Sequence, residues 1–152
     1  MNSIQTRIAA TLACLLAAAS PLAVHAQATP DLAAAAAKEK GANVLPSGLV
    51  ITSLKEGSGP MPAATDTVRV HYRGVLADGK EFDSSYKRGE PTAFPLNSVI
   101  PCWTEGVQRM KPGGKAKLTC PPAIAYGAAG AGGVIPPNAT LNFEIELIAV
   151  SR

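Results

Sequence analysis

VRVHYRGVLADGKEFD, residues 68–83, is the stretch that decides the fold class of this 152-residue chain. Its apolar residues Val68, Val70 and Tyr72 alternate with polar ones, which is the period of a strand with one buried face. The dipeptide Asp78-Gly79 favours a two-residue turn between antiparallel strands. The stretch therefore predicts a β-hairpin that packs one face on a core.

The flanking sequence repeats this pattern and adds one helix. A short apolar run bounded by a turn predicts a further strand over 49–54, and alternating apolar residues predict strands over 115–120 and 141–149. Helical spacing occurs in one segment, with Trp103, Val107 and Met110 at i, i+4 and i+7. Pro101 suits the first turn of this helix, and Pro112-Gly113-Gly114 suits its end. Antiparallel strands with a short helix on their apolar face predict an α+β domain.

Residues 1–26 have the pattern of an export signal. Arg7 precedes an apolar run over residues 8–19, and small residues precede a cut after Ala26. A cut after Ala28 fits the same rule, whereas lipid attachment through Cys14 fits poorly because Cys14 lies inside the apolar run. The run is shorter than the roughly 20 residues that a membrane span needs. We therefore expect a periplasmic or secreted protein without a membrane span.

Residues 27–45 predict an alanine-rich linker, with a short helix possible, before a folded domain over residues 46–152. Alanine and lysine favour helix, and Gly41 suits its end. Because Leu32 is the one larger apolar residue of this helix, there is no apolar seam for dimerisation. The sequence therefore predicts a monomer.

Several classes of function find no support in the sequence. The formal net charge is +3, without a cluster of Lys and Arg, so nucleic acid is not an expected partner. After removal of the signal, His71, Cys102 and Cys120 are too few and too dispersed for a metal site. The glycines over 127–133 lack dinucleotide-binding spacing, and no serine lies in a nucleophile elbow. We expect neither a cofactor nor a metal.

The glycine-rich and proline-rich segment 121–138 has neither the helical nor the strand period. A loop of this length in a compact domain is usually functional or disordered. Tyr126, Val134 and Ile135 favour the functional interpretation, because they would let the loop fold over something apolar.

Six motifs together resemble the signature of FKBP-type peptidyl-prolyl cis-trans isomerases, in order and over residues 46–150. The resemblance implies a curved antiparallel sheet wrapped around one short α-helix, with a proline pocket between them. It also implies an enzyme that turns Xaa-Pro bonds in polypeptides without a cofactor and that binds the macrolide inhibitors of the family. The motifs are Val70-His71-Tyr72-Arg73-Gly74, Asp78-Gly79-Lys80-Glu81-Phe82-Asp83-Ser84-Ser85, Val99-Ile100, Trp103-Thr104-Glu105-Gly106-Val107, Ala125-Tyr126-Gly127 and Ile135-Pro136-Pro137-Asn138-Ala139-Thr140-Leu141.

The same resemblance implies the site residues. Asp83, the backbone N–H of Ile100 and the hydroxyl of Tyr126 would act on the substrate, and Trp103 would form the pocket floor. Taken singly, each of these residues would more often belong to a core or a turn. Ala131-Gly132 and Pro101-Cys102 depart from commoner versions of the signature. The remaining substrate-binding residues implied are Tyr72, Phe82, Phe94, Val99, Ile135 and Phe143.

Two alternatives stay open in the sequence. The same groove would also serve a non-catalytic chaperone or scaffold module that binds polypeptides. In the implied architecture Cys102 begins the helix and Cys120 shares the apolar face of its strand, so an exported protein would bridge them. The alternative is a pair of buried thiols that never meet.

Overall fold

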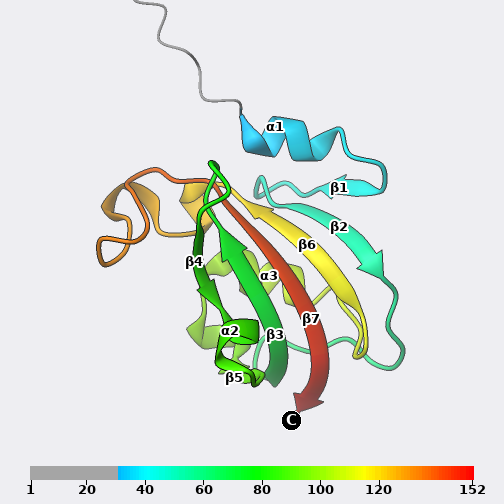
Figure 1. Ribbon diagram of the computed structural model, residues 1–152. Helices are drawn as coiled ribbons and strands as arrows, with labels where there is room; N and C mark the ends of the chain where they lie inside the picture. The colour runs from blue at the N-terminus through cyan, green and yellow to red at the C-terminus, as the bar shows by residue number, and fades with distance from the viewer. Residues whose placement is uncertain (1–30) are drawn as a thin grey trace, which may run out of the picture.

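The structure, a computed structural model, describes residues 31–152, so the predicted export signal lies outside the described residues. A curved sheet wraps around helix α3, and shorter helices lie at its margins (Figure 1). The strands are β1 (Ala42–Val44), β2 (Val50–Lys55), β3 (Thr67–Val75), β4 (Glu81–Ser84), β5 (Thr92–Pro95), β6 (Lys115–Cys120) and β7 (Leu141–Ser151). The helices are α1 (Leu32–Ala37), α2 (Ser85–Arg88) and α3 (Pro101–Val107), and the 3-10 turns are η1 (Leu96–Ser98), η2 (Pro122–Ile124) and η3 (Gly127–Ala129).

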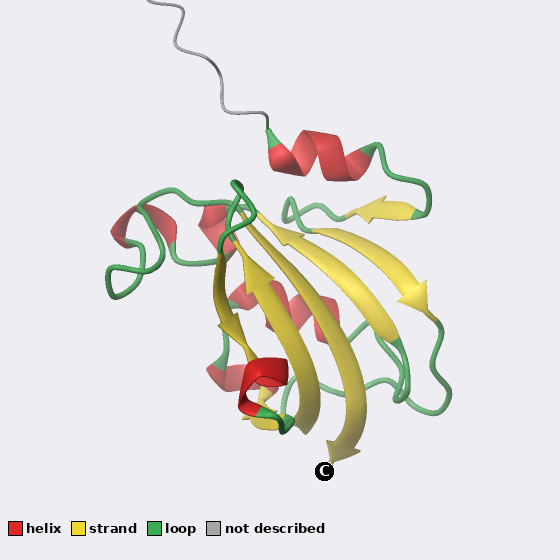
Figure 2. Ribbon diagram, viewed as in Figure 1, coloured by secondary structure: helices red, strands yellow, loops and turns green. Residues whose placement is uncertain are grey.

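Every strand pair of the sheet is antiparallel, in the order β1-β2-β6-β7-β3-β4, and β5 pairs with β3. The two central strands are the longest, β3 and β7, with Tyr72 opposite Ile145 and Gly74 opposite Phe143. Figure 2 shows α3 against one face of this sheet. The predicted α+β class, with a curved antiparallel sheet around a short helix, is confirmed.

The core lies between that face and α3. Val68, Val70 and Tyr72 are buried along β3, as their alternation predicts. Gly106 lets α3 approach the sheet closely, because a Cβ at this position would overlap the side chain of Leu118 on β6. Since a well-packed core tolerates little added volume, this glycine sets the depth at which the helix sits.

Cys102 and Cys120 form a disulfide that ties α3 to the end of β6, with a Cα–Cα distance of 5.8 Å. Both residues are fully buried. The bridge between these cysteines, left open by the sequence, is confirmed in the structure.

Other local features differ from the sequence predictions. Helix α3 ends at Val107, so Met110 is buried beyond the helix rather than within it. Helix α2 and strand β5 were not predicted by periodicity, because four residues are too few to show a period.

The segment assigned to a linker takes regular structure from Leu32 onward. Asp31 caps α1, since its Oδ1 accepts from the backbone N–H of Ala33 at 3.1 Å. Strand β1 then pairs with β2, which extends the sheet by one strand. Lys117 on β6 also pairs with Glu39 at 2.6 Å. Residues 31–44 therefore pack on the domain.

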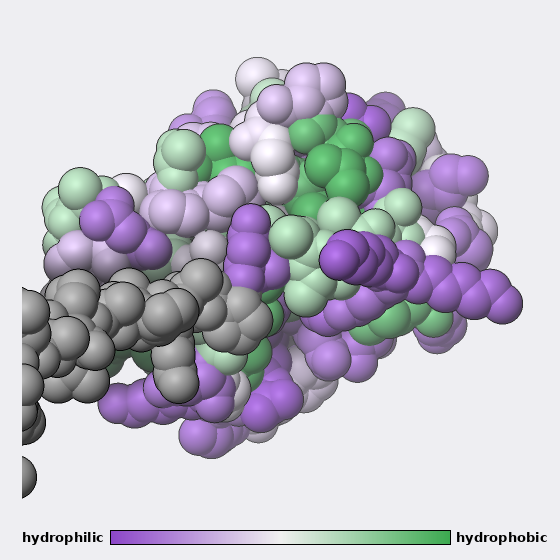
Figure 3. Space-filling model, turned by 90° about the horizontal axis from the view of Figure 1, so that it is seen from above, coloured by the Kyte–Doolittle hydropathy of each residue, from purple (hydrophilic) through white to green (hydrophobic). Residues whose placement is uncertain are grey.

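Apolar and polar side chains are interspersed over the end of the molecule on which α1 lies (Figure 3). Val44 and Leu54 are among the apolar residues that remain exposed. No helix among residues 31–152 is long and apolar enough to cross a membrane.

Candidate functional site

A cleft of about 270 Å³ opens between the sheet, the start of α3 and the loop after β6. It brings together nine of the ten predicted substrate-contacting residues, from six separate segments of the chain. The tenth, Ile135, is buried in the adjoining loop rather than in the lining. Ser98, which was not predicted, also lines the cleft. The lining residues are Tyr72, Phe82, Asp83, Phe94, Ser98, Val99, Ile100, Trp103, Tyr126 and Phe143.

Trp103 forms the floor of the cleft and is only 4% exposed. Three aromatic rings meet its ring edge to face, with centroid distances of 5.1 Å for Tyr72, 5.5 Å for Phe94 and 5.3 Å for Phe143. This geometry is favourable because the positive edge of one ring faces the negative face of another. The buried Nε1 of Trp103 has no hydrogen-bond partner among residues 31–152. The floor is therefore aromatic and closely packed, with one indole N–H that is unpaired within the described residues.

A glycine makes room for the wall of the cleft. Gly74 follows Tyr72 by two positions on β3, so it lies on the same inner face. A Cβ at Gly74 would lie within 2.9 Å of the rings of Phe82 and Phe143. These two rings meet edge to face at 5.6 Å. The Tyr-Arg-Gly sequence thus supplies one wall residue and the space for two others.

A polar cluster stands at the rim of the cleft. The Tyr72 hydroxyl donates to Oδ2 of Asp83 at 2.5 Å, and Arg88 donates to Oδ1 of Asp83 at 2.7 Å. Arg88 also donates to the Tyr72 hydroxyl at 2.8 Å. Sequence reasoning missed Arg88; its one signal is a basic residue in the last turn of α2, five positions after Asp83. The three side chains hold one another in place.

The electrostatics of this cluster keep Asp83 ionised and Tyr72 neutral. Burial acts to raise the pKa of Asp83, but hydrogen bonds from Tyr72 and Arg88 outweigh it and lower the pKa below its ordinary value. Burial, helped by the hydrogen bond to Asp83, raises the pKa of Tyr72, while Arg88 opposes that shift only in part. The rim therefore carries a fixed carboxylate at neutral pH.

Besides the buried indole N–H of Trp103, two hydrogen-bond donors at the cleft are unused within residues 31–152. The backbone N–H of Ile100 has no acceptor there, although the carbonyl of Ile100 accepts from the backbone N–H of Trp103 at 2.9 Å. The Tyr126 hydroxyl also has no hydrogen bond to another described residue, and this side chain is 39% exposed. Free donors above an aromatic floor suit a ligand with a small ring next to a carbonyl group.

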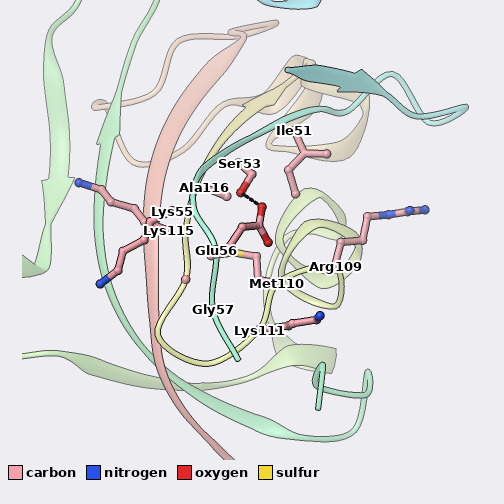
Figure 4. Close-up of a pocket in the computed structure, with 11 residues that line it drawn as sticks. Ile51, Ser53, Lys55, Glu56, Gly57, Arg109, Met110, Lys111, Lys115 and Ala116 are labelled. Atoms are coloured by element: carbon pink, nitrogen blue, oxygen red, sulfur yellow. Dashed lines mark hydrogen bonds between the residues drawn. The ribbon is translucent and has the colours of Figure 1, made fainter. Parts of the chain in front are cut away.

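A second, smaller hollow lies beside β2 and the segment after α3 (Figure 4). Its volume is about 90 Å³, and none of its lining residues is aromatic. Glu56 turns inward and accepts from Ser53 at 2.5 Å, whereas Arg109 and Lys111 point away from the hollow. Because it holds none of the predicted site residues, the aromatic cleft is the better candidate.

Comparisons of sequence point to one family. The sequence model described as "FKBP-type peptidyl-prolyl cis-trans isomerase" matches residues 59–148. The chain is 55% identical over 114 residues to the FKBP-type peptidyl-prolyl cis-trans isomerase FkpA of Escherichia coli strain K12, a match that covers 75% of this chain and 42% of FkpA. It is also 55% identical over 103 residues to FK506-binding protein 1 of Dictyostelium discoideum, covering 66% of this chain and 96% of that protein. The chain thus spans less than half the length of FkpA.

Solved structures agree with this match. The crystal structure of FkpA from Escherichia coli superposes with a TM-score of 0.78 at 50% identity, covering 81% of this chain and 57% of that one. A peptidyl-prolyl cis-trans isomerase from Pseudomonas syringae superposes with a TM-score of 0.76 at 45% identity, covering 82% and 92%.

Proposed function

This chain belongs to the family of FKBP-type peptidyl-prolyl cis-trans isomerases, and from that premise we propose that it accelerates rotation about Xaa-Pro bonds in exported polypeptides. The observation that carries the proposal is the cleft itself, with an aromatic floor and two unused donors above it. The cleft offers a place for a pyrrolidine ring and partners for the carbonyl group beside it.

The reaction needs no covalent step. The barrier to rotation of the peptide bond is about 18–20 kcal/mol, because rotation breaks the partial double bond. The planar amide carries more charge separation than the twisted one. An apolar cleft that excludes water therefore destabilises the planar form relative to the twisted transition state. This chemistry suits a site whose main resource is aromatic surface.

Each lining group has a role in this proposal. Trp103 and Phe143 hold the proline ring, while the Ile100 N–H and the Tyr126 hydroxyl donate to backbone carbonyls of the substrate. Asp83, ionised at the rim, fixes the Tyr72 side chain and presents a negative charge to the bound polypeptide. The proline ring is enclosed by Phe82, Phe94, Val99 and Tyr72. Ile135 supports the loop that carries Tyr126.

The cellular setting is part of the same proposal. We infer that residues 1–26 direct export and are removed near Ala26, and that the protein works as a monomer in the periplasm or outside the cell. A buried disulfide supports this location, because disulfides persist in oxidising compartments. Macrolide inhibitors of the family would occupy the cleft and compete with substrate.

The test is an exchange assay by NMR, or a protease-coupled assay, on a short Xaa-Pro peptide with residues 27–152. We expect isomerisation above the uncatalysed rate, unchanged by a chelator and abolished by a macrolide inhibitor. A correctly folded protein that binds the peptide but leaves the rate at background would overturn the catalytic proposal. That outcome would favour a chaperone or scaffold module that uses the same groove.

A further inference from the structure

Directly behind Tyr72, on the outer face of the sheet, lies a group of three side chains that does not line the cleft. Ser85 is fully buried, and its Oγ accepts from the backbone N–H of Tyr72 at 2.8 Å. The same Oγ lies 2.9 Å from Nδ1 of His71 and 3.3 Å from the carbonyl oxygen of Tyr72. The ring of His71 stacks on Tyr86, with centroids 4.7 Å apart and planes at 11°.

The Ser85 hydroxyl has one proton and two acceptors to choose between. When Nδ1 of His71 carries no proton, it can accept the Ser85 proton over the shorter distance. When His71 is protonated, Nδ1 donates instead, and the Ser85 proton must turn to the carbonyl of Tyr72. Since good O–H···O bonds are about 2.7–2.8 Å long, closing the 3.3 Å gap requires Ser85 to shift toward β3.

A shift of Ser85 reaches the cleft through a single short helix. Ser85 is the first residue of α2 and Arg88 is the last. Arg88 holds both Asp83 and the hydroxyl of Tyr72. Tyr72 is thus fixed at its backbone by one end of α2 and at its side-chain hydroxyl by the other end.

We propose that Ser85 is a positioning residue for the rim of the cleft, and that protonation of His71 redirects the Ser85 hydroxyl and lowers turnover. This inference rests on the proposed isomerase function. The test spans pH 5 to 8, the interval in which histidine side chains in general change charge. Asp83 does not change its charge within this pH interval, because its pKa is lowered from an ordinary value that already lies below the interval.

Charged side chains of both signs surround His71 on the outer face of the sheet. Glu146 on β7 lies opposite His71 in the register, and its Oε2 accepts from the Tyr86 hydroxyl at 3.4 Å. The other charged groups around this face are Arg69 and Arg73 on β3, Lys115 on β6 in register with Glu146, Glu144 on β7 beside Lys115, and Lys87 on α2, which pairs with Glu81.

The experiment compares pH profiles of kcat/KM from pH 5 to 8 for the wild-type protein, His71→Gln, Ser85→Ala and the control Lys111→Ala. We expect kcat/KM of the wild type and the control to fall on acidification by about twofold to tenfold, the net effect of one hydrogen bond. His71→Gln should give a flat profile. Ser85→Ala should be flat and lower throughout, and Ser85→Thr, which restores the hydroxyl, should restore the step. A flat wild-type profile, or a step that persists in His71→Gln, would overturn the proposal.

A second readout is independent of turnover. The NMR shifts of the Tyr72 backbone amide and the Trp103 indole N–H should follow the titration of the His71 ring in the wild type but not in Ser85→Ala. If the protein proves inactive as an isomerase, these shifts still decide whether His71 is coupled to the cleft. If the NMR shifts of Tyr72 and Trp103 stay constant while the His71 ring titrates, the proposed coupling is wrong, even in an active enzyme.

Discussion

Trp103, at the floor of the cleft, is 4% exposed and meets three aromatic rings, whereas Tyr126, at its mouth, is 39% exposed and has no hydrogen bond to another described residue. The floor belongs to the core that α3 forms with the sheet. The mouth belongs to the glycine-rich loop after β6. Mutations at the floor should therefore alter folding and activity together, while mutations at the mouth should alter activity alone.

The largest effect should follow loss of the floor. Trp103→Ala removes a buried ring that three others contact, so we expect a loss of about 3–5 kcal/mol in the free energy of unfolding, together with loss of isomerase activity. Urea unfolding followed by circular dichroism measures the first, and the peptide assay measures the second. Trp103→Phe is the matched control, because it keeps an aromatic ring and should lose less of both. Wild-type stability in Trp103→Ala would mean that the floor is not part of the core.

Removing the disulfide tests whether the floor and the mouth of the cleft depend on the same covalent link. Cys102 lies next to Trp103 at the floor, and Cys120 precedes the loop that carries the mouth; the bridge closes a loop with a sequence separation of 18. Replacing both cysteines with alanine should cost about 3 kcal/mol in the chain-entropy model. Because the surrounding core remains, kcat/KM of the folded fraction should change little.

Mass spectrometry of the native, never-reduced protein provides the control for that comparison. The native protein should contain no alkylatable thiol after unfolding. Two alkylatable thiols would show that the bridge does not form in the cell, and the double variant would then lose only the packing of two small side chains.

The sequence predicts the walls of the cleft better than the contacts at its rim, and the reason is periodicity. Val70, Tyr72 and Phe143 lie on strands whose alternation marks the buried face, and the motifs of the family identify which buried residues line a cleft. Arg88 was not predicted, because α2 has only four residues and the contact of Arg88 with Asp83 depends on the turn that follows β4. The pairing of β1 with β2 was also missed, because three residues next to an alanine-rich helix carry no alternation.

Asp83, at the rim, should show an effect of intermediate size that depends on pH. Its pKa is lowered in the folded protein, so the stabilisation is present above the unfolded value, about 3.9, and is lost as pH falls through the folded pKa. Asp83→Asn should thus be less stable than the wild type at pH 7, and the difference should shrink toward pH 3. Thermal unfolding at both pH values measures this difference. An equal difference at the two pH values would mean that the charge of Asp83 contributes nothing.

The smallest effect on stability, and the sharpest separation of the two regions, should come from Tyr126→Phe. The substitution deletes one exposed hydroxyl that bonds to no described residue, so unfolding should change by no more than about 0.5 kcal/mol. If that hydroxyl donates to a carbonyl of the substrate, kcat/KM should fall about twofold to tenfold, the net effect of one hydrogen bond. Lys111→Ala is the control, since Lys111 is exposed and lies at the second hollow, away from the cleft. Equal activity in Tyr126→Phe and the wild type would show that the mouth binds substrate through shape alone, and the Ile100 N–H would then remain as the one proposed donor to the substrate.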